Sequence, residues 1–179
     1  MITGLLGGMP MFWPGLLLSL VPAALLNRPV GRLLRAHWAV GFLLLLGLGG
    51  VLTATLLPDA FRWSESAVRH CAVAGVRPRR PHELLTVPHL GFKLAAYASL
   101  GVAAALAGSR WRAGLALLGA AAVPFAVAAV RYAVPAIGRP CDVQDAWDGV
   151  QGVVLGAVLG LLAGPVLRAV AGRARAHSV

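Results

Sequence analysis

Five long runs of uncharged, mostly apolar residues dominate this chain and restrict the folds open to it. The runs cover residues 1–27, 36–58, 94–109, 113–130 and 149–167. Each is about 20 residues long, or reaches that length when a charged end residue is tolerated, as a helix crossing about 30 Å of hydrocarbon requires. Apolar residues make up 59% of the 179 residues and charged residues only 12%, which is typical of a membrane protein. The sequence therefore predicts an all-α, polytopic membrane bundle of about five transmembrane helices.

The expected helices span about residues 4–26, 38–57, 88–107, 113–134 and 145–168, in a single integral membrane domain over residues 1–179. A cleavable signal peptide is the competing interpretation of the first run. That run has no basic residue at its start and no clear A-x-A cleavage site before Asn27, so we expect it to be retained as a helix. Within the polar stretch 59–89, the segment 61–76 is predicted to form a short amphipathic helix on the membrane surface.

Charge is distributed unequally between the two sides of this five-span arrangement. One side carries eight arginines and no acid: Arg28, Arg32, Arg35, Arg110, Arg112, Arg168, Arg173 and Arg175. The other side carries the remaining eight cations together with all six acids. Because cytoplasmic loops are enriched in Lys and Arg, the N-terminus is predicted outside and the C-terminus in the cytoplasm. The basic cytoplasmic loops are then expected to contact anionic lipid headgroups. The net charge of +10 is explained in this way, and no nucleic-acid partner is expected.

Both cysteines, Cys71 and Cys141, lie on the outer side of this arrangement. In an oxidising compartment they would form a disulfide joining two outer loops. The alternative is two unrelated thiols, because the sequence does not reveal whether the two Cα atoms approach within about 7 Å.

Four glycines recur at intervals of four in the last apolar run: Gly152, Gly156, Gly160 and Gly164. Residues four apart share one face of a helix. A ridge of glycine lets another helix approach closely in a bilayer. We therefore expect this face to be a helix-packing surface.

Three acids precede that ridge at steps of three, namely Asp142, Asp145 and Asp148. If the fifth helix begins near Asp142, all three lie along one side of its first turns. One acid is then explained as an N-cap or by the helix dipole. Pairing of Asp145 with Arg139 is one alternative, and direct contact with a ligand is the other.

Lys93 and Tyr97 are four residues apart on the third predicted helix and share a face. They are expected near the outer end of the bundle, where Arg131 also approaches the end of the fourth span. One interpretation is interfacial anchoring of Lys93 and Tyr97. The other is that both belong to a polar site with the three aspartates.

The sequence contains no G-x-S-x-G elbow, no phosphate-binding glycine loop ending in Lys and no H-E-x-x-H zinc motif. Neither a cofactor nor a bound metal is therefore expected. The case for an enzyme depends only on the clustering of ionisable residues, so we do not expect a catalyst.

Two motifs resemble the VanZ-like family of small bacterial membrane proteins, named for a teicoplanin-resistance protein. The first matches a glycine and arginine followed by Asp at three and six positions, then spaced glycines: Gly138, Arg139, Asp142, Asp145, Gly152 and Gly156. The second matches Lys93, Tyr97, Leu100 and Gly101, and the segment 55–58 is similar to a family helix ending. Lys93 replaces the usual histidine and Gly149 the usual asparagine. The resemblance covers about residues 40–165 and implies a multi-pass protein of the bacterial cytoplasmic membrane.

These observations predict a non-enzymatic envelope protein with a polar site at the outer leaflet. Its residues would be Lys93, Tyr97, Arg131, Arg139, Asp142, Asp145 and Asp148. The expected ligand is a lipid headgroup or a lipid-linked cell-wall precursor, with Lys93 and Arg139 holding a phosphate and an aspartate holding an amine. The resemblance implies an influence on glycopeptide susceptibility. The alternatives are an intramembrane enzyme with Asp145 or Asp148 as general base, and a lipid transporter or scramblase.

Overall fold

Every apolar run contributes a helix in the computed structural model, which describes residues 12–56, 71–73, 75–80, 88–137 and 141–176. The helices are α2 (Phe12–Leu33), α3 (Trp38–Leu56), α5 (Pro88–Ala105), α6 (Arg110–Ala133) and α7 (Val143–Ala176), with a 3-10 turn η1 (Pro135–Ile137). Four contain segments long and apolar enough to cross a membrane: Pro14–Leu33, Trp38–Leu56, Arg110–Ala133 and Val143–Pro165. In α5 the apolar part is the shorter segment Lys93–Ala105. The predicted helical membrane bundle is thus confirmed with four candidate spans among the described residues.

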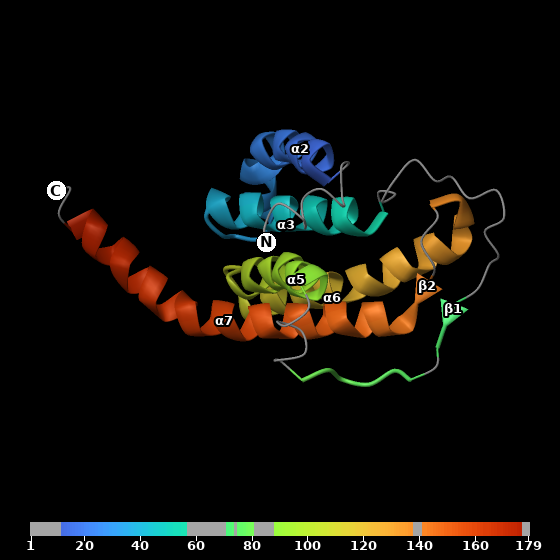
Figure 1. Cartoon of the computed structure of the whole chain (residues 1–179). Helices are drawn as coiled ribbons and strands as arrows, with labels where there is room; N and C mark the ends of the chain where they lie inside the picture. Colours follow the sequence, from blue (N-terminus) through green and yellow to red (C-terminus); the bar gives the residue numbers. More distant parts are fainter. Residues whose placement is uncertain (1–11, 57–70, 74, 81–87, 138–140, 177–179) are drawn as a thin grey trace.

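The bundle is arranged around α5, which lies between α3 and α7 with α6 beside it (Figure 1). Helix α2 packs on the other side of α3, and α7 continues well beyond its neighbours (Figure 1). The core between these helices contains the fully buried side chains of Val51 and Leu100, with Val127 and Val153 packed around them. Large apolar side chains on the outer faces, among them Leu18, Leu118 and Leu162, are 73%, 69% and 69% exposed. A helix bundle with apolar residues on both its inner and outer faces is suited to lipid.

The closest helix contact joins α5 to the glycine ridge of α7. A Cβ added at Gly152 would lie 2.8 Å from the Cβ of Tyr97, and one at Gly160 would lie 2.9 Å from the Cβ of Ala105. At Gly156 it would collide with the backbone of Ala98. The fourth glycine of the ridge, Gly164, is also buried. Absence of side chains on this face brings the two backbones together, which fixes the height of α5 residues relative to those of α7.

Two helices extend further than predicted. The predicted start of the first helix, near residue 4, lies outside the described residues. Its end is at Leu33 instead of near residue 26. Its interior tolerates Pro29, and the Asn27 side chain donates to the carbonyl of Ala24 one turn earlier. Helix α7 likewise runs to Ala176 instead of ending near residue 168. No proline follows Pro165, and most residues from 168 to 176 are alanine or arginine, which favour helix.

The predicted amphipathic helix over residues 61–76 is wrong in its described part. Instead of a helix, β1 (Cys71–Ala72) pairs in parallel with β2 (Cys141–Asp142). Gly75 adopts a φ of 76°, a left-handed conformation that a helix does not permit. The remainder of the predicted segment lies outside the described residues. A pairing partner 70 positions away, which local periodicity does not reveal, therefore determines the conformation here.

Candidate functional site

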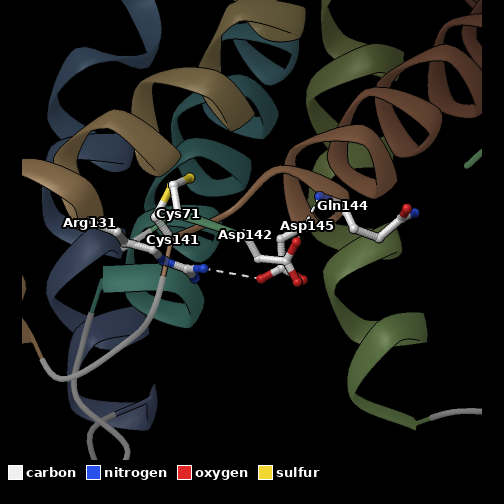
Figure 2. Close-up of a disulfide and its surroundings, with 6 residues drawn as sticks. All are labelled: Cys71, Arg131, Cys141, Asp142, Gln144 and Asp145. Carbon is white, nitrogen blue, oxygen red and sulfur yellow. Dashed lines mark hydrogen bonds and ion pairs between the residues drawn. A yellow bond between two sulfur atoms is a disulfide. The ribbon is translucent and has the colours of Figure 1, made fainter. Parts of the chain in front are cut away.

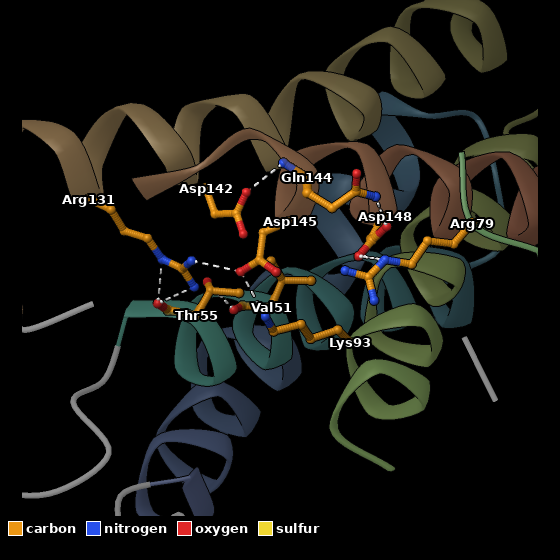
Figure 3. Close-up of polar contacts among 9 residues, drawn as sticks. All are labelled: Val51, Thr55, Arg79, Lys93, Arg131, Asp142, Gln144, Asp145 and Asp148. Atoms are coloured by element: carbon orange, nitrogen blue, oxygen red, sulfur yellow. Dashed lines mark hydrogen bonds and ion pairs between the residues drawn. The ribbon is translucent and has the colours of Figure 1, made fainter. Parts of the chain in front are cut away.

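One carboxylate on α7 is shared by two cations from two other helices. The Nζ atom of Lys93 on α5 lies 2.8 Å from Oδ2 of Asp145, and Nη1 of Arg131 on α6 lies 3.0 Å from the same oxygen (Figure 3). The Lys93 side chain is only 18% exposed. Lys93 therefore points into the bundle toward an acid, which differs from a lysine that only anchors a helix at the interface.

Arg131 also binds the end of α3. Its side chain is 5% exposed, and its Nε and Nη2 donate to the carbonyl oxygen of Thr55 at 3.1 and 2.9 Å. This carbonyl lies in the last turn of α3, where backbone acceptors have no partner within the helix. One guanidinium thus satisfies a helix terminus and a carboxylate at once. Together with Lys93, it connects α3, α5, α6 and α7 at one level of the bundle.

A second polar network surrounds Asp148, one turn along α7. The Nε2 atom of Gln144 donates to Asp148 Oδ1 at 2.8 Å, and Nε of Arg79 lies 3.2 Å from Oδ2 (Figure 3). Gln144 also exchanges two hydrogen bonds of 2.9 Å with the backbone of Arg77. Gln151 then donates to the Arg79 carbonyl at 3.3 Å. These contacts attach residues 71–73 and 75–80, here called the strap, to the first turns of α7.

The strap is also attached covalently. Cys71 and Cys141 form a disulfide with a Cα–Cα distance of 4.4 Å, beside the β1–β2 pairing (Figure 2). Of the two interpretations left open by the sequence, the structure has the disulfide. The disulfide therefore attaches one end of the strap, at Cys71, and the Asp148 network attaches the other end, at Arg77 and Arg79.

Asp142 differs from the other two aspartates because it precedes the helix. It lies in β2, and α7 begins at Val143. Its Oδ1 accepts from the backbone N–H of Gln144 at 2.8 Å, as an N-cap does. The alternative in which one acid serves as the N-cap is therefore confirmed for Asp142, while Asp145 and Asp148 lie within the helix. Each of the three has its own set of partners.

Arg139 lies outside the described residues, so its predicted pairing with Asp145 is not observed there. The described partners of Asp145 are Lys93 and Arg131.

Tyr97 lies one turn from Lys93 and lines a small cavity next to the shared carboxylate. The residue is 3% exposed. Its Cβ is adjacent to Gly152 and its Cε2 to Gly149, so the ring runs along α7 toward Asp145. The cavity has room for roughly one water molecule before it opens to the surface. It is lined by residues of α3, α5, α6, β2 and α7: Thr55, Lys93, Tyr97, Pro124, Val127, Ala128, Arg131, Asp142, Asp145 and Ala146.

The structure thus brings Lys93, Tyr97, Arg131, Asp142 and Asp145 to one cavity and places Asp148 in the neighbouring network. The sequence interpretation missed Thr55, whose contribution is a backbone oxygen, and Arg79. Gln144 could have been found, because it precedes Asp148 by four positions on one helix face.

Within the described ranges, no group of three or more His, Cys, Asp or Glu side chains is placed to hold a metal ion. Comparison of the chain with models of protein families, with characterised proteins and with solved structures finds no match.

Proposed function

We propose that this chain is a VanZ-like, multi-pass protein of the bacterial cytoplasmic membrane that binds a lipid headgroup or lipid-linked cell-wall precursor at the outer leaflet. The observation that carries the proposal is the cavity at the outer end of the bundle, where Lys93 and Arg131 share Asp145. Residues of both motifs that resemble the family, Lys93 and Tyr97 from one and Asp142 and Asp145 from the other, line this cavity.

The cavity is rich in unused hydrogen-bond donors. Lys93 uses one of its three N–H groups on Asp145, and Arg131 uses three of its five on Asp145 and Thr55. Among the described residues, no acceptor occupies the others. Phosphate oxygens are the strongest common acceptors for such groups. The cavity itself holds roughly one water molecule, so we propose that a phosphate-bearing headgroup lies at its open mouth and directs an oxygen to these donors.

The proposed topology has five crossings, with the N-terminus outside and the C-terminus in the cytoplasm. The turn after α2 and the turn before α6 meet at one end, where Gly108 donates to the Leu34 carbonyl at 2.9 Å and the Arg112 guanidinium binds the Leu33 carbonyl. This end is basic, which supports a cytoplasmic location. The opposite end carries the disulfide, which requires an oxidising compartment. Since α5 connects the two ends, we count it as the fifth crossing.

Labelling of introduced cysteines tests this topology. In intact cells, a membrane-impermeant maleimide is expected to label Arg80→Cys and to label Arg110→Cys only after permeabilisation. Cys71 and Cys141 are joined, so they do not contribute free thiols. Equal labelling of both variants in intact cells would contradict the proposed orientation.

Lipid retention tests the binding site. Purified full-length protein is expected to carry bound phospholipid in native mass spectrometry, and Lys93→Gln to reduce that retention at least about fivefold by removing a charge-assisted bond. Arg28→Gln is the matched control, because it removes one exposed cation at the opposite end. Equal retention by both variants would refute a headgroup site at Lys93.

The pairing of Asp145 with two cations supports binding over general-base catalysis, because both cations stabilise the carboxylate and compete with an incoming proton. A role in glycopeptide susceptibility is tested by expression in a teicoplanin-susceptible bacterium. Wild-type protein should shift the inhibitory concentration of teicoplanin, and Lys93→Gln should not.

A further inference from the structure

Asp142 is the acid in this cluster that has no cationic partner among the described residues. Asp145 is neutralised by Lys93 and Arg131, and Asp148 by Arg79. Asp142 uses one oxygen as the N-cap of α7 and lines the cavity. We infer that the bound headgroup carries a primary ammonium group beside its phosphate, and that Asp142 receives the ammonium. This inference rests on the proposed function and narrows its ligand class.

The phosphate side of the cavity is completed by Tyr97. Its side chain is almost fully buried, and no described residue is hydrogen-bonded to its hydroxyl. Its ring runs along α7 from Gly152 past Gly149 toward Asp145. The hydroxyl oxygen is not among the buried side-chain atoms that lack a partner, so it is open to the cavity and can bond to a ligand. A ligand oxygen in the cavity would satisfy it together with the unused N–H groups of Lys93 and Arg131.

The charge balance of the cavity favours a zwitterion. The two cations, Lys93 and Arg131, face the two carboxylates of Asp142 and Asp145, so the four side chains sum to zero. A purely anionic headgroup would gain from the cations and be repelled by Asp142. A headgroup with phosphate and ammonium satisfies both halves.

Hydrogen bonding also separates a primary from a quaternary ammonium. A primary ammonium offers three N–H donors to the carboxylate of Asp142, and a trimethylammonium offers none. Among the described residues that line the cavity, Tyr97 is the one aromatic side chain, whereas aromatic cages bind a trimethylammonium group with several rings. Among common headgroups, phosphoethanolamine therefore fits and phosphocholine does not.

Competition between lipids in native mass spectrometry tests this inference. Delipidated full-length protein is mixed with equal amounts of dioleoyl phosphatidylethanolamine, phosphatidylcholine and phosphatidylglycerol. We expect phosphatidylethanolamine to be retained roughly tenfold over each of the others, which corresponds to one charge-assisted hydrogen bond. Asp142→Asn should abolish this preference. Asparagine is as good an N-cap as aspartate, so α7 keeps its start.

Asp148→Asn is the matched control. It removes the same charge from the same end of α7, but Asp148 does not line the cavity and contacts the strap instead. The lipid preference of this variant should equal that of the wild type. Thermal unfolding of both variants verifies that each is folded.

Each result separates this inference from the proposed function. Equal retention of the three lipids that still depends on Lys93 would overturn the ammonium site and leave the lipid site standing. Loss of lipid preference in Asp148→Asn as well as in Asp142→Asn would also overturn it. Free O-phosphoethanolamine, added without lipid, distinguishes the source of the headgroup. If it binds and no lipid competes, the ammonium site stands and the lipid proposal fails.

Discussion

Arg131 is the residue on which most of the site depends. Its position near the C-terminal end of α6 was predictable from the apolar run that precedes it, and its membership of a polar site was proposed from the sequence. Its two partners were not predictable, because one is a backbone carbonyl of α3 and the other lies across a loop. A sequence shows the type of a residue and its position along its own helix. Which side chains of two helices pair depends also on how the helices are shifted relative to each other along their axes.

Replacing Arg131 tests how much this position stabilises the bundle. Arg131→Met leaves the Thr55 carbonyl without its donors and Asp145 with one cation, so we expect a loss of about 3 kcal/mol in the free energy of unfolding. Arg131→Lys retains the charge but not the planar fork, and should lose less. Denaturant titration in detergent measures both. A Lys variant as unstable as the Met variant would show that geometry, and not charge, determines the effect.

At the scale of elements, the apolar runs predicted the helices well and the connections poorly. The bounds of α3, α5 and α6 lie within a few residues of those expected, because each of these helices ends close to the end of its apolar run. The end of α2 was missed, since the helix continues through charged residues and Pro29. The local sequence pattern predicts the bounds of the apolar run of a helix. It does not predict how far the helical backbone continues beyond that run.

A matched pair of glycine substitutions tests the α5–α7 contact. Gly156→Ala places a Cβ against the Ala98 backbone, where no side chain can move aside. We expect a loss of about 1–3 kcal/mol. Gly119→Ala on α6 meets nothing within 4 Å and should be neutral or stabilising by up to about 1 kcal/mol. If thermal unfolding shifts equally for both, the glycine ridge does not determine packing.

At the scale of the whole molecule, the strap is a non-helical segment that is attached to the first turns of α7. Its attachment combines the disulfide at Cys71 with the contacts of Arg77 and Arg79 to α7. The sequence suggested the disulfide as one of two alternatives, but the polar network beside it involves residues 67 to 72 positions apart and has no local signature.

Removing the disulfide tests the strap. The sequence separation of 70 residues predicts that Cys71→Ser with Cys141→Ser loses about 4 kcal/mol through the larger entropy of the unfolded chain. Tryptic cleavage after Arg79 should also become faster, because the segment is then attached by non-covalent contacts only. Arg77 and Arg80 precede prolines and do not compete as cleavage sites. Unchanged cleavage in the double variant would show that the Asp148 network alone retains the strap.

The length of α7 has a consequence for membrane depth. Its 34 residues correspond to about 51 Å of helix, whereas the hydrocarbon layer is about 30 Å thick. The backbone of Arg168 lies about 35 Å from that of Asp145 along the helix axis, slightly more than the thickness of the hydrocarbon layer. In the proposed orientation, Arg173 and Arg175 follow on the cytoplasmic side. This single helix is thus long enough to cross the hydrocarbon layer with an acidic residue near one end of the crossing and arginines beyond the other.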